Sequence, residues 1–240
     1  MLEIAGLEKH YGEVKAVQGL SLTIEPGEIF CMLGANGAGK TTTLMVSLGF
    51  TEPTTGSVKI CGIDVAKDPL EAKKHVAYVS ENVMLYGNFT ARQNLDFFTK
   101  LGGVKDATDQ AYEQVLARVG LQQDAFNRRV KGFSKGMRQK LGIAIAIMKD
   151  AEVILLDEPT SGLDPKSGAE FLHLLAELRA EGKAIWMTTH DIFRAKEIAD
   201  RVGIMVAGRL VQVLTREELQ QQDLEAIYVQ YVSQPTEQAA

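Results

Sequence analysis

Several features that mark whole classes of protein are scarce or missing in this sequence. Only two of the 240 residues are cysteine, too few for a disulfide-rich scaffold, and Cys31 and Cys61 lack the CxxC spacing of a metal or redox pair. Both lie in apolar, strand-like stretches, so we expect two buried thiols in a reducing compartment. No apolar run approaches the ~18 residues that a membrane span needs, and the first residues carry no secretory signal. We therefore expect a cytoplasmic protein.

Linkers, repeats and low-complexity stretches are also missing from the sequence, which argues against a string of separate modules. The length and the 45% of hydrophobic residues suit one globular unit with a sizeable core. The charge is uneven, because the net charge is −5 but residues 82–150 contain eleven Lys and Arg against six Asp and Glu. Such a basic segment either forms an ordinary solvated surface or faces phosphate groups or an acidic partner.

The apolar runs that are present predict an α/β fold. Several short β-rich segments are continuously apolar, as expected for parallel strands that are buried on both faces. The segments begin at Leu2, Leu20, Glu28, Ser57, Val76, Val153, Ala184 and Val202. Helical patterns separate many of them, and this alternation predicts a mainly parallel sheet with flanking helices.

Residues 90–149 differ from the rest, because their pattern is helical and contains no clear strand. The stretch TARQ forms a capping box, with Thr90 as the cap and Gln93 three residues later. Further helices are expected over 106–119 and 135–148.

This change of pattern predicts how the single domain is organised. We expect a core made of residues 1–81 and 151–222, into which a helical lobe, residues 82–150, is inserted. The segment VAGRLVQV near the end is typical of a β-hairpin, and TREE is a second capping box. A short C-terminal helix and a frayed tail are expected over 223–240.

A glycine-rich loop gives the strongest functional signal in the chain. Residues 34–41, GANGAGKT, fit the phosphate-binding pattern GxxxxGK[ST] at every fixed position, after an apolar strand and before a helix. Backbone N–H groups of such a loop wrap a phosphate, helped by the helix dipole. Lys40 is expected to reach the outer phosphates, and the Thr41 hydroxyl to ligate Mg²⁺. The residues expected to contact a nucleotide here are Gly34, Asn36, Gly37, Ala38, Gly39, Lys40, Thr41 and Thr42.

The segment VILLDE, residues 153–158, supplies two acids. Its apolar residues predict a buried strand whose carboxyl end brings Asp157 and Glu158 beside the phosphate loop. Asp157 can hold Mg²⁺ directly or through water, and Glu158 can polarise an attacking water. A strand that ends in two acids is a weak signal alone, but together with the phosphate loop it indicates nucleotide hydrolysis.

The stretch FSKGMRQK, residues 133–140, places a serine, a lysine and a glycine at the start of a second helix that suits an anion. With this stretch, the chain resembles the nucleotide-binding subunit of an ABC transporter, and the motifs occur in that family's order over essentially the whole chain. Residues 133–137 match the family signature, usually written LSGGQ. The other matches are Tyr11, before the first glycine turn; Ser80-Glu81, at the loop between core and helical lobe; Ser161 to Asp164; and His190.

The resemblance implies a P-loop NTPase core with an N-terminal antiparallel β region and an inserted helical subdomain. It also implies an ATPase that uses ATP and Mg²⁺ and dimerises head to tail, so that each ATP lies between one chain's phosphate loop and the other chain's signature. Ser134 and Gly136 would contact the γ-phosphate on the opposite chain, and His190 would hydrogen-bond the γ-phosphate or the attacking water. The implied partners are a second ATPase subunit and an integral membrane permease at the inner face of the cell membrane, with no nucleic acid.

Four of the residues carried over from the family leave alternatives open. Lys135 stands where the family favours glycine, and it either strengthens γ-phosphate binding or extends into solvent. Glu81 replaces the usual glutamine, and it is either a Mg²⁺ ligand with an extra negative charge or an exposed loop acid. Tyr11 is either the platform for adenine or a half-buried tyrosine at a strand edge. Asp164 either shapes the dimer interface near the neighbouring site or only caps a helix.

Transport is the function that the resemblance favours. The signature, the acid at position 81 and the compact C-terminus look most like the ABC-2 exporter group. Met84, Leu85 and Tyr86 form an apolar patch, which either receives a coupling helix of the membrane subunit or packs on its own core. The alternatives are the ATPase of an importer and a soluble ABC ATPase that acts in assembly. A P-loop kinase or GTPase would leave the signature, the SGLD motif and His190 without roles.

Overall fold

The structure, a computed structural model, describes residues 1–233 of the chain. The strands are β1 (Leu2–Tyr11), β2 (Val14–Ile24), β3 (Ile29–Leu33), β4 (Thr55–Ile60), β5 (Ile63–Asp64), β6 (Val76–Val79), β7 (Val153–Asp157), β8 (Ala184–Thr189), β9 (Arg201–Val206) and β10 (Arg209–Thr215). The helices are α1 (Lys40–Ser47), α2 (Pro69–Lys74), α3 (Ala91–Leu101), α4 (Asp109–Arg118), α5 (Gln123–Phe126), α6 (Lys135–Met148), α7 (Pro165–Ala180), α8 (Ile192–Ile198), α9 (Arg216–Gln221) and α10 (Leu224–Ser233), with a 3-10 turn at Val130–Gly132.

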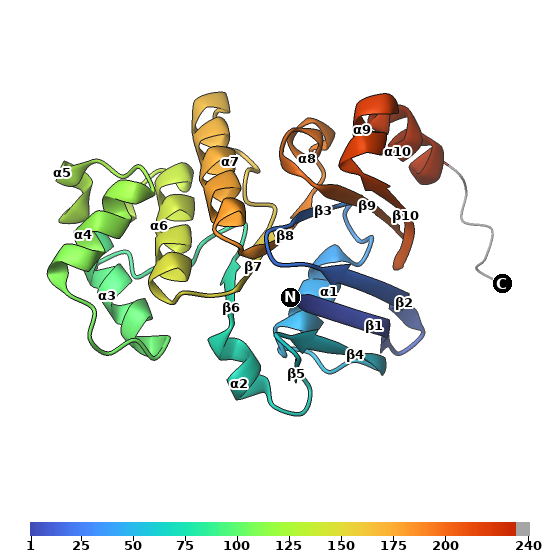
Figure 1. Ribbon diagram of the computed structural model, residues 1–240, viewed down its shortest axis with the longest axis horizontal. Helices are drawn as coiled ribbons and strands as arrows, with labels where there is room; N and C mark the ends of the chain where they lie inside the picture. The colour runs from blue at the N-terminus through green and yellow to red at the C-terminus, as the bar shows by residue number, and fades with distance from the viewer. Residues whose placement is uncertain (234–240) are drawn as a thin grey trace.

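Within residues 1–233 the strands form two sheets, which Figure 1 shows beside each other. The first is antiparallel and has the order β2-β1-β4-β5, and the second has the order β10-β9-β3-β8-β7-β6. In the second sheet every neighbouring pair is parallel except β10 with β9. The predicted α/β fold, with a mainly parallel sheet and an N-terminal antiparallel region, is confirmed.

The parallel sheet is covered on both faces, which explains why its strands are continuously apolar. Alternate side chains of β3 point to opposite faces, so Cys31 belongs to the apolar core that includes α6, α7 and α8. Phe30 belongs to the other core, which lies between the sheet, α1 and the antiparallel strands. Trp186 of β8 is fully buried in that second core, as its apolar strand suggests.

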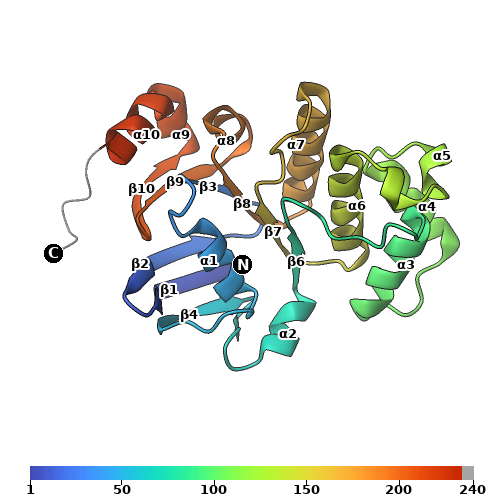
Figure 2. The same ribbon diagram turned by 180° about the vertical axis from the view of Figure 1, so that it is seen from behind.

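The helices α3 to α6 gather at one end of the molecule in both views (Figures 1 and 2). The capping box at Thr90 and Gln93 is confirmed, because both reciprocal hydrogen bonds are present. Helix α6 has the bounds expected from the sequence, whereas α4 begins later than residue 106. The reason for the later start is Thr108, whose hydroxyl caps α4 by accepting a hydrogen bond from the Ala111 N–H.

One of the two expected buried thiols is placed differently. Cys31 is fully buried, and burial raises the pKa of its thiol far above the ordinary value. Cys61 is exposed, so its prediction was wrong, because the residue occupies the tight turn between β4 and β5 with a φ of 50° rather than the strand itself. The apolar run that precedes it ends one residue earlier.

The C-terminal part follows the expected pattern as far as it is described. Strands β9 and β10 form the predicted hairpin, and Thr215 and Glu218 form the second capping box. The last residues, predicted to be frayed, lie outside the described range, except that Ser233 ends α10. Across residues 1–233, every helix is too short or too polar to cross a bilayer.

Candidate functional site

The phosphate loop joins β3 to α1, and its glycines are required by close contacts. A Cβ atom on Gly34 would lie 2.7 Å from the Met205 carbonyl oxygen, and one on Gly39 would lie 2.4 Å from the Ala16 carbonyl oxygen. Gly39 also has a φ of 107°, which residues with side chains rarely adopt. The chain can therefore wrap the start of α1 only because glycine stands at these two positions.

The first turn of α1 keeps its N–H groups free of any side-chain cap within the described chain, since Gly39 has no side chain to offer. Lys40 follows at once, and its side chain is only 6% exposed. Its Nζ donates hydrogen bonds to the carbonyl oxygens of Gly34, at 2.5 Å, and of Ala35, at 3.3 Å. A buried ammonium and a free helix start together form a site for an anion.

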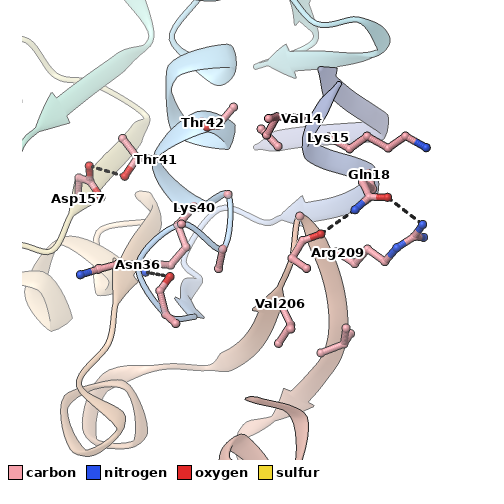
Figure 3. Close-up of a pocket in the computed structure, with 18 of the residues that line it drawn as sticks. Val14, Lys15, Gln18, Asn36, Lys40, Thr41, Thr42, Asp157, Val206 and Arg209 are labelled. Carbon is pink, nitrogen blue, oxygen red and sulfur yellow. Dashed lines mark hydrogen bonds between the residues drawn. The ribbon is translucent and has the colours of Figure 1, made fainter. Parts of the chain in front are cut away.

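The acids of β7 meet this loop. The Thr41 hydroxyl donates a hydrogen bond to Asp157 Oδ2 at 3.2 Å, and the Thr188 hydroxyl donates to Asp157 Oδ1 at 2.6 Å. The Asp157 carboxylate is therefore held beside the first residues of α1 (Figure 3). The hydroxyl and the carboxylate are hard oxygen donors, which Mg²⁺ prefers.

Glu158 lies next to Lys40 and His190. Its Oε1 is 3.7 Å from Lys40 Nζ, and its Oε2 is 2.9 Å from His190 Nδ1. The side chain is 14% exposed, and Oε1 is buried without a hydrogen-bond partner in the part of the chain that is described. The backbone has a φ of 48°, and its N–H donates to the carbonyl oxygen of Thr188. A buried carboxylate with a free acceptor is a suitable general base.

These groups face a cleft of about 1180 Å³. Every residue expected in the phosphate loop except Gly34 lines the cleft, together with Glu81, Asp157 and Glu158. Tyr11, predicted as the adenine platform, is not among the lining residues of the described chain; it is half exposed, and the Lys9 ammonium lies 4.8 Å from the centre of its ring.

The wall opposite the phosphate loop was not anticipated. It is formed by Val14, Lys15 and Gln18 of β2 and by Arg209 of β10. Gln18 donates to the Ala207 carbonyl oxygen at 2.7 Å and accepts from Arg209 at 3.0 Å (Figure 3). No motif marks these residues, since they come from strands of different sheets that only the folded chain brings together.

Glu81 and Lys135 contact each other directly. Lys135 Nζ donates to Glu81 Oε1 at 3.1 Å, and the Ser161 hydroxyl donates to the same oxygen at 3.1 Å. The hydrogen bond from Lys135 is the main reason that the pKa of Glu81 is lowered, so the carboxylate keeps its charge well into acid. The sequence offered two alternatives for Lys135, a contact with phosphate or a side chain that extends into solvent. Within one chain the structure shows neither, because Lys135 pairs with Glu81.

Three other residues of the signature, Ser134, Gly136 and Met137, line a second cavity, of about 450 Å³. Ser134 caps α6 by accepting the Met137 N–H at 3.2 Å, and Gly136 packs so closely that a Cβ would lie 3.3 Å from Ser167 Cβ. Asp164 caps α7, because it accepts both the N–H and the hydroxyl of Ser167, and these bonds lower the pKa of its carboxyl. Ser134, Gly136 and Asp164 all line this cavity.

Together, these features of the first cleft fit a nucleoside triphosphate with a divalent cation. A Cβ on Gly34 or Gly39 would collide with a carbonyl oxygen of the protein, the helix start is uncapped within residues 1–233, and a buried lysine stands beside it. The hydroxyl of Thr41 and the carboxylate of Asp157 lie together as oxygen donors of the kind that a divalent cation prefers. The fold and this site define a P-loop nucleoside triphosphatase.

Comparison with known proteins identifies the family. Residues 17–161 match the family model described as ABC transporter, and the chain belongs to that family. It is 40% identical over 200 residues to the ABC transporter ATP-binding protein NatA of Bacillus subtilis, covering 82% of this chain and 81% of NatA. It is 35% identical over 224 residues to the bacitracin transport ATP-binding protein BcrA of Bacillus licheniformis, covering 93% of this chain and 72% of BcrA.

Solved structures agree with this assignment. The ATP-binding subunit of an ABC transporter superposes with a TM-score of 0.85 at 28% identity, covering 97% of this chain and 99% of that chain. A dimeric ATP-binding cassette in a post-hydrolysis state, bound to ADP and Pi, superposes with a TM-score of 0.81 at 26% identity, covering 90% of this chain and 99% of that one. The protein is an ATP-binding and ATP-hydrolysing subunit of an ABC transporter.

Proposed function

We propose that this chain hydrolyses Mg²⁺-ATP in a head-to-tail homodimer and drives export through a separate membrane permease. The single observation that carries the chemistry is the Glu158 carboxylate, which has a buried oxygen without a hydrogen-bond partner in residues 1–233 and a lysine ammonium 3.7 Å away. A carboxylate oxygen that is shielded from solvent and still able to accept a hydrogen bond can take the proton of an attacking water.

The neighbouring residues are assigned roles around that base. Lys40 binds the outer phosphates, and His190 uses its Nδ1 to hold the second oxygen of Glu158, which leaves Nε2 for the γ-phosphate or the water. When bound, Mg²⁺ supplies positive charge against the phosphate oxygens. Thr41, Asp157 and Glu81 would ligate it, because the three side chains line the same cleft.

The head-to-tail dimer is proposed because the chain has two phosphate-facing surfaces that are made of different residues. The cleft at the phosphate loop and the cavity at Ser134 and Gly136 have no lining residue in common. In a two-fold symmetric pair, each signature can complete the nucleotide site of the opposite chain. One of the solved relatives is described as a dimeric ABC transporter cassette, which supports the same arrangement here.

The permease is assigned to an aromatic surface on the helical lobe, defined by Met84, Tyr86, Phe89, Phe97 and Leu101, all of which are exposed. The Tyr86 and Phe97 rings lie 5.0 Å apart edge to face, and a shallow hollow beside them is lined by Phe89, Phe97 and Leu101. Exposed apolar clusters of this kind commonly mark a protein interface. This surface would hold the chain at the inner face of the cell membrane.

Export is the direction we favour over import or a role in assembly. Several relatives carry export or resistance in their names, among them the Nod factor export ATP-binding protein I of Burkholderia lata and the linearmycin resistance ATP-binding protein LnrL of Bacillus subtilis. The former is 35% identical over 88% of this chain and the latter 33% over 91%.

Purification from native membranes tests the permease assignment. An integral protein with several apolar spans of ~20 residues should accompany the tagged chain, and Phe97→Glu should lose it. The matched control is Phe193→Glu, because Phe193 is also an exposed phenylalanine but lies on α8. Both variants should still bind ATP. Retention of the membrane protein by Phe97→Glu, or the same loss with Phe193→Glu, would reject this surface.

A further inference from the structure

A cysteine, a histidine and a glutamate converge away from the nucleotide cleft. Cys61 lies in the turn between β4 and β5, His75 follows the last residue of α2, and Glu152 precedes β7. One ligand atom from each lies within 4.8 Å of the other two. His75 Nδ1 is already 3.0 Å from Glu152 Oε1. Three segments from distant parts of the chain thus bring a thiol, an imidazole and a carboxylate to one point.

The main chain holds the three residues in place. The His75 carbonyl oxygen accepts the N–H groups of Glu152, at 3.1 Å, and of Val153, at 3.0 Å. The Cys61 N–H donates to the Met1 carbonyl oxygen at 2.9 Å. These bonds extend the pairing of the strands, so they fix the main-chain positions from which the three side chains reach one another.

The donor set is that of zinc. A thiolate and an imidazole favour Zn²⁺ over Mg²⁺ or Ca²⁺, which prefer oxygen, and three protein ligands leave a fourth position for water. The other ring nitrogen of His75, Nε2, faces Glu71 Oε1 at 3.9 Å. A carboxylate on the far side of a ligating imidazole is the usual outer partner in zinc sites, since it orients the ring.

We propose that Cys61, His75 and Glu152 bind one Zn²⁺ ion. On binding, the Cys61 thiol loses its proton to solvent and the Zn–S bond forms. The His75–Glu152 contact opens, and the imidazole carries its hydrogen on Nε2, toward Glu71, so that the Nδ1 lone pair is free for the ion. The Lys149 ammonium lies close enough to act electrostatically on Glu152, but it is held by the carbonyl oxygens of Lys73 and Val76. It therefore stays beside the site without blocking a ligand atom.

The zinc site lies at the opposite end of the parallel sheet from the catalytic residues. His75 and Glu152 precede β6 and β7, whereas Asp157 ends β7, and five residues of strand span roughly 16 Å. The ion would join the β4–β5 turn of the antiparallel sheet to the starts of the edge strand β6 and its neighbour β7. It acts as a clamp between the two sheets and takes no part in ATP hydrolysis.

Cobalt titration of the nucleotide-free, chelator-treated protein tests this site. With cobalt chloride as the probe, the wild type should develop a thiolate-to-cobalt charge-transfer band that saturates at one equivalent, and zinc chloride should displace it. Cys61→Ser should abolish the band, and His75→Gln should weaken cobalt binding by more than the roughly 10–100-fold that loss of an outer partner costs. Glu71→Gln should weaken cobalt binding by only that roughly 10–100-fold.

Two matched variants separate this site from other metal binding. Cys31→Ser removes the buried thiol, and His173→Gln removes an exposed histidine that also pairs with a glutamate; both should keep the band and the wild-type cobalt affinity. Zinc should also raise the thermal unfolding midpoint of the wild type but not of Cys61→Ser. A wild type without a thiolate band, or with one that survives Cys61→Ser or disappears with His173→Gln, would overturn the proposal. ATP binding by each variant confirms that it is folded.

Discussion

At the scale of single residues, Glu158 combines an unusual backbone with an unusual side-chain position. A left-handed φ of 48° in a residue with a side chain costs about 1–3 kcal/mol. The conformation is held by the hydrogen bond from its N–H to the Thr188 carbonyl oxygen. It turns the side chain from the end of β7 toward Lys40 and His190. The strain is therefore located at the group that we assign as the base.

Glu158→Gln should keep ATP binding but slow hydrolysis by roughly 10²–10⁴-fold, because an amide of the same shape cannot take a proton. The ATP-bound protein should accumulate as a dimer on a sizing column. Phosphate release and column elution measure the two effects. Glu177→Gln, on an exposed part of α7, should behave like the wild type. Turnover of Glu158→Gln near the wild-type rate would contradict the assigned role.

The ion pair between Lys135 and Glu81 makes a second residue-scale prediction. Lys135 ties up the carboxylate that we assign to Mg²⁺, so the two cations compete for it. Both side chains are partly exposed, 31% and 45%, and such a pair is worth only about 0–1 kcal/mol. Lys135→Met should therefore lower the Mg²⁺ concentration needed for half-maximal nucleotide binding, but by less than about fivefold.

Fluorescent-nucleotide binding across a Mg²⁺ titration measures this shift. The control is Lys67→Met, since Lys67 also pairs with a nearby acid, Asp64, but lies outside the cleft. A higher Mg²⁺ requirement in Lys135→Met would mean that Glu81 is not a ligand. Glu81→Gln should then bind Mg²⁺-nucleotide as well as the wild type does.

At the scale of elements, a buried amide positions the aromatic surface of the helical lobe. Asn94 of α3 is fully buried, and its side chain accepts the Tyr86 N–H at 2.8 Å and donates to the carbonyl oxygens of Tyr86 and Thr90. These three bonds fix the loop that carries Tyr86 to the start of α3. The same loop is also tied to the segment before α6, because the Lys131 N–H donates to the Gly87 carbonyl oxygen and the Val130 N–H to that of Phe89.

Asn94→Ala should destabilise the protein by about 1–3 kcal/mol, because two backbone groups of Tyr86 lose their partner. In a chain of this size the melting temperature should fall by about 2–4 °C per kcal/mol. Asn127→Ala, an exposed asparagine of the same lobe, should change stability by less than about 0.5 kcal/mol. Thermal unfolding measures both variants, and equal melting temperatures for the two would refute this role of the amide.

Elements whose signal is local could be predicted from the sequence. The phosphate loop, the strand before Asp157 and both capping boxes each depend on neighbouring residues, so their patterns are complete within a short window. The Cys61 turn could not be predicted, since the preceding apolar residues belong to a strand and the turn itself carries only one glycine. Helix α4 was started too early because Asp106 and Thr108 are both acceptable caps.

Contacts between distant residues could not be predicted at all. Lys135 and Glu81 are 54 positions apart, and their ion pair depends on how the helical lobe docks on the core. The same is true of Gln18 and Arg209, which line the cleft from different sheets. Family resemblance indicates that Glu81 and Lys135 lie near the nucleotide, but it does not say that the two side chains pair with each other in one chain.

At the scale of the whole molecule, one chain has two helix starts, at Lys40 and at Ser134, that lie apart from each other. In both ribbon views, α1 with its phosphate loop lies beside the antiparallel sheet, while α6 lies among the helices beyond α7 (Figures 1 and 2). Ser134 at the start of α6 and Lys40 at the start of α1 line separate cavities. If each nucleotide needs both helix starts, a variant with one defective helix start should regain ATPase activity only when another chain supplies an intact one.

Mixing two inactive variants tests this. Ser134→Arg has an intact phosphate loop and a blocked signature, and Lys40→Ala has the reverse. Each should be inactive alone, although Ser134→Arg should still bind ATP. In the mixed dimer one site combines the two intact halves, so mixing equal amounts should restore roughly a quarter of the wild-type ATPase rate if the two sites act independently and all pairings form equally.

A second mixture provides the control, because Lys40→Ala and Glu158→Gln both damage the half-site at the phosphate loop. In their mixed dimer each site keeps a good signature but lacks either the lysine or the base, so no activity should return. Recovery in the first mixture and none in the second is the pattern that a head-to-tail dimer requires. Normal ATPase activity of Ser134→Arg alone would show that the helix start at Ser134 serves no nucleotide. Recovery in both mixtures would mean that activity does not depend on pairing one chain's phosphate loop with the other chain's signature, and the head-to-tail dimer would be rejected.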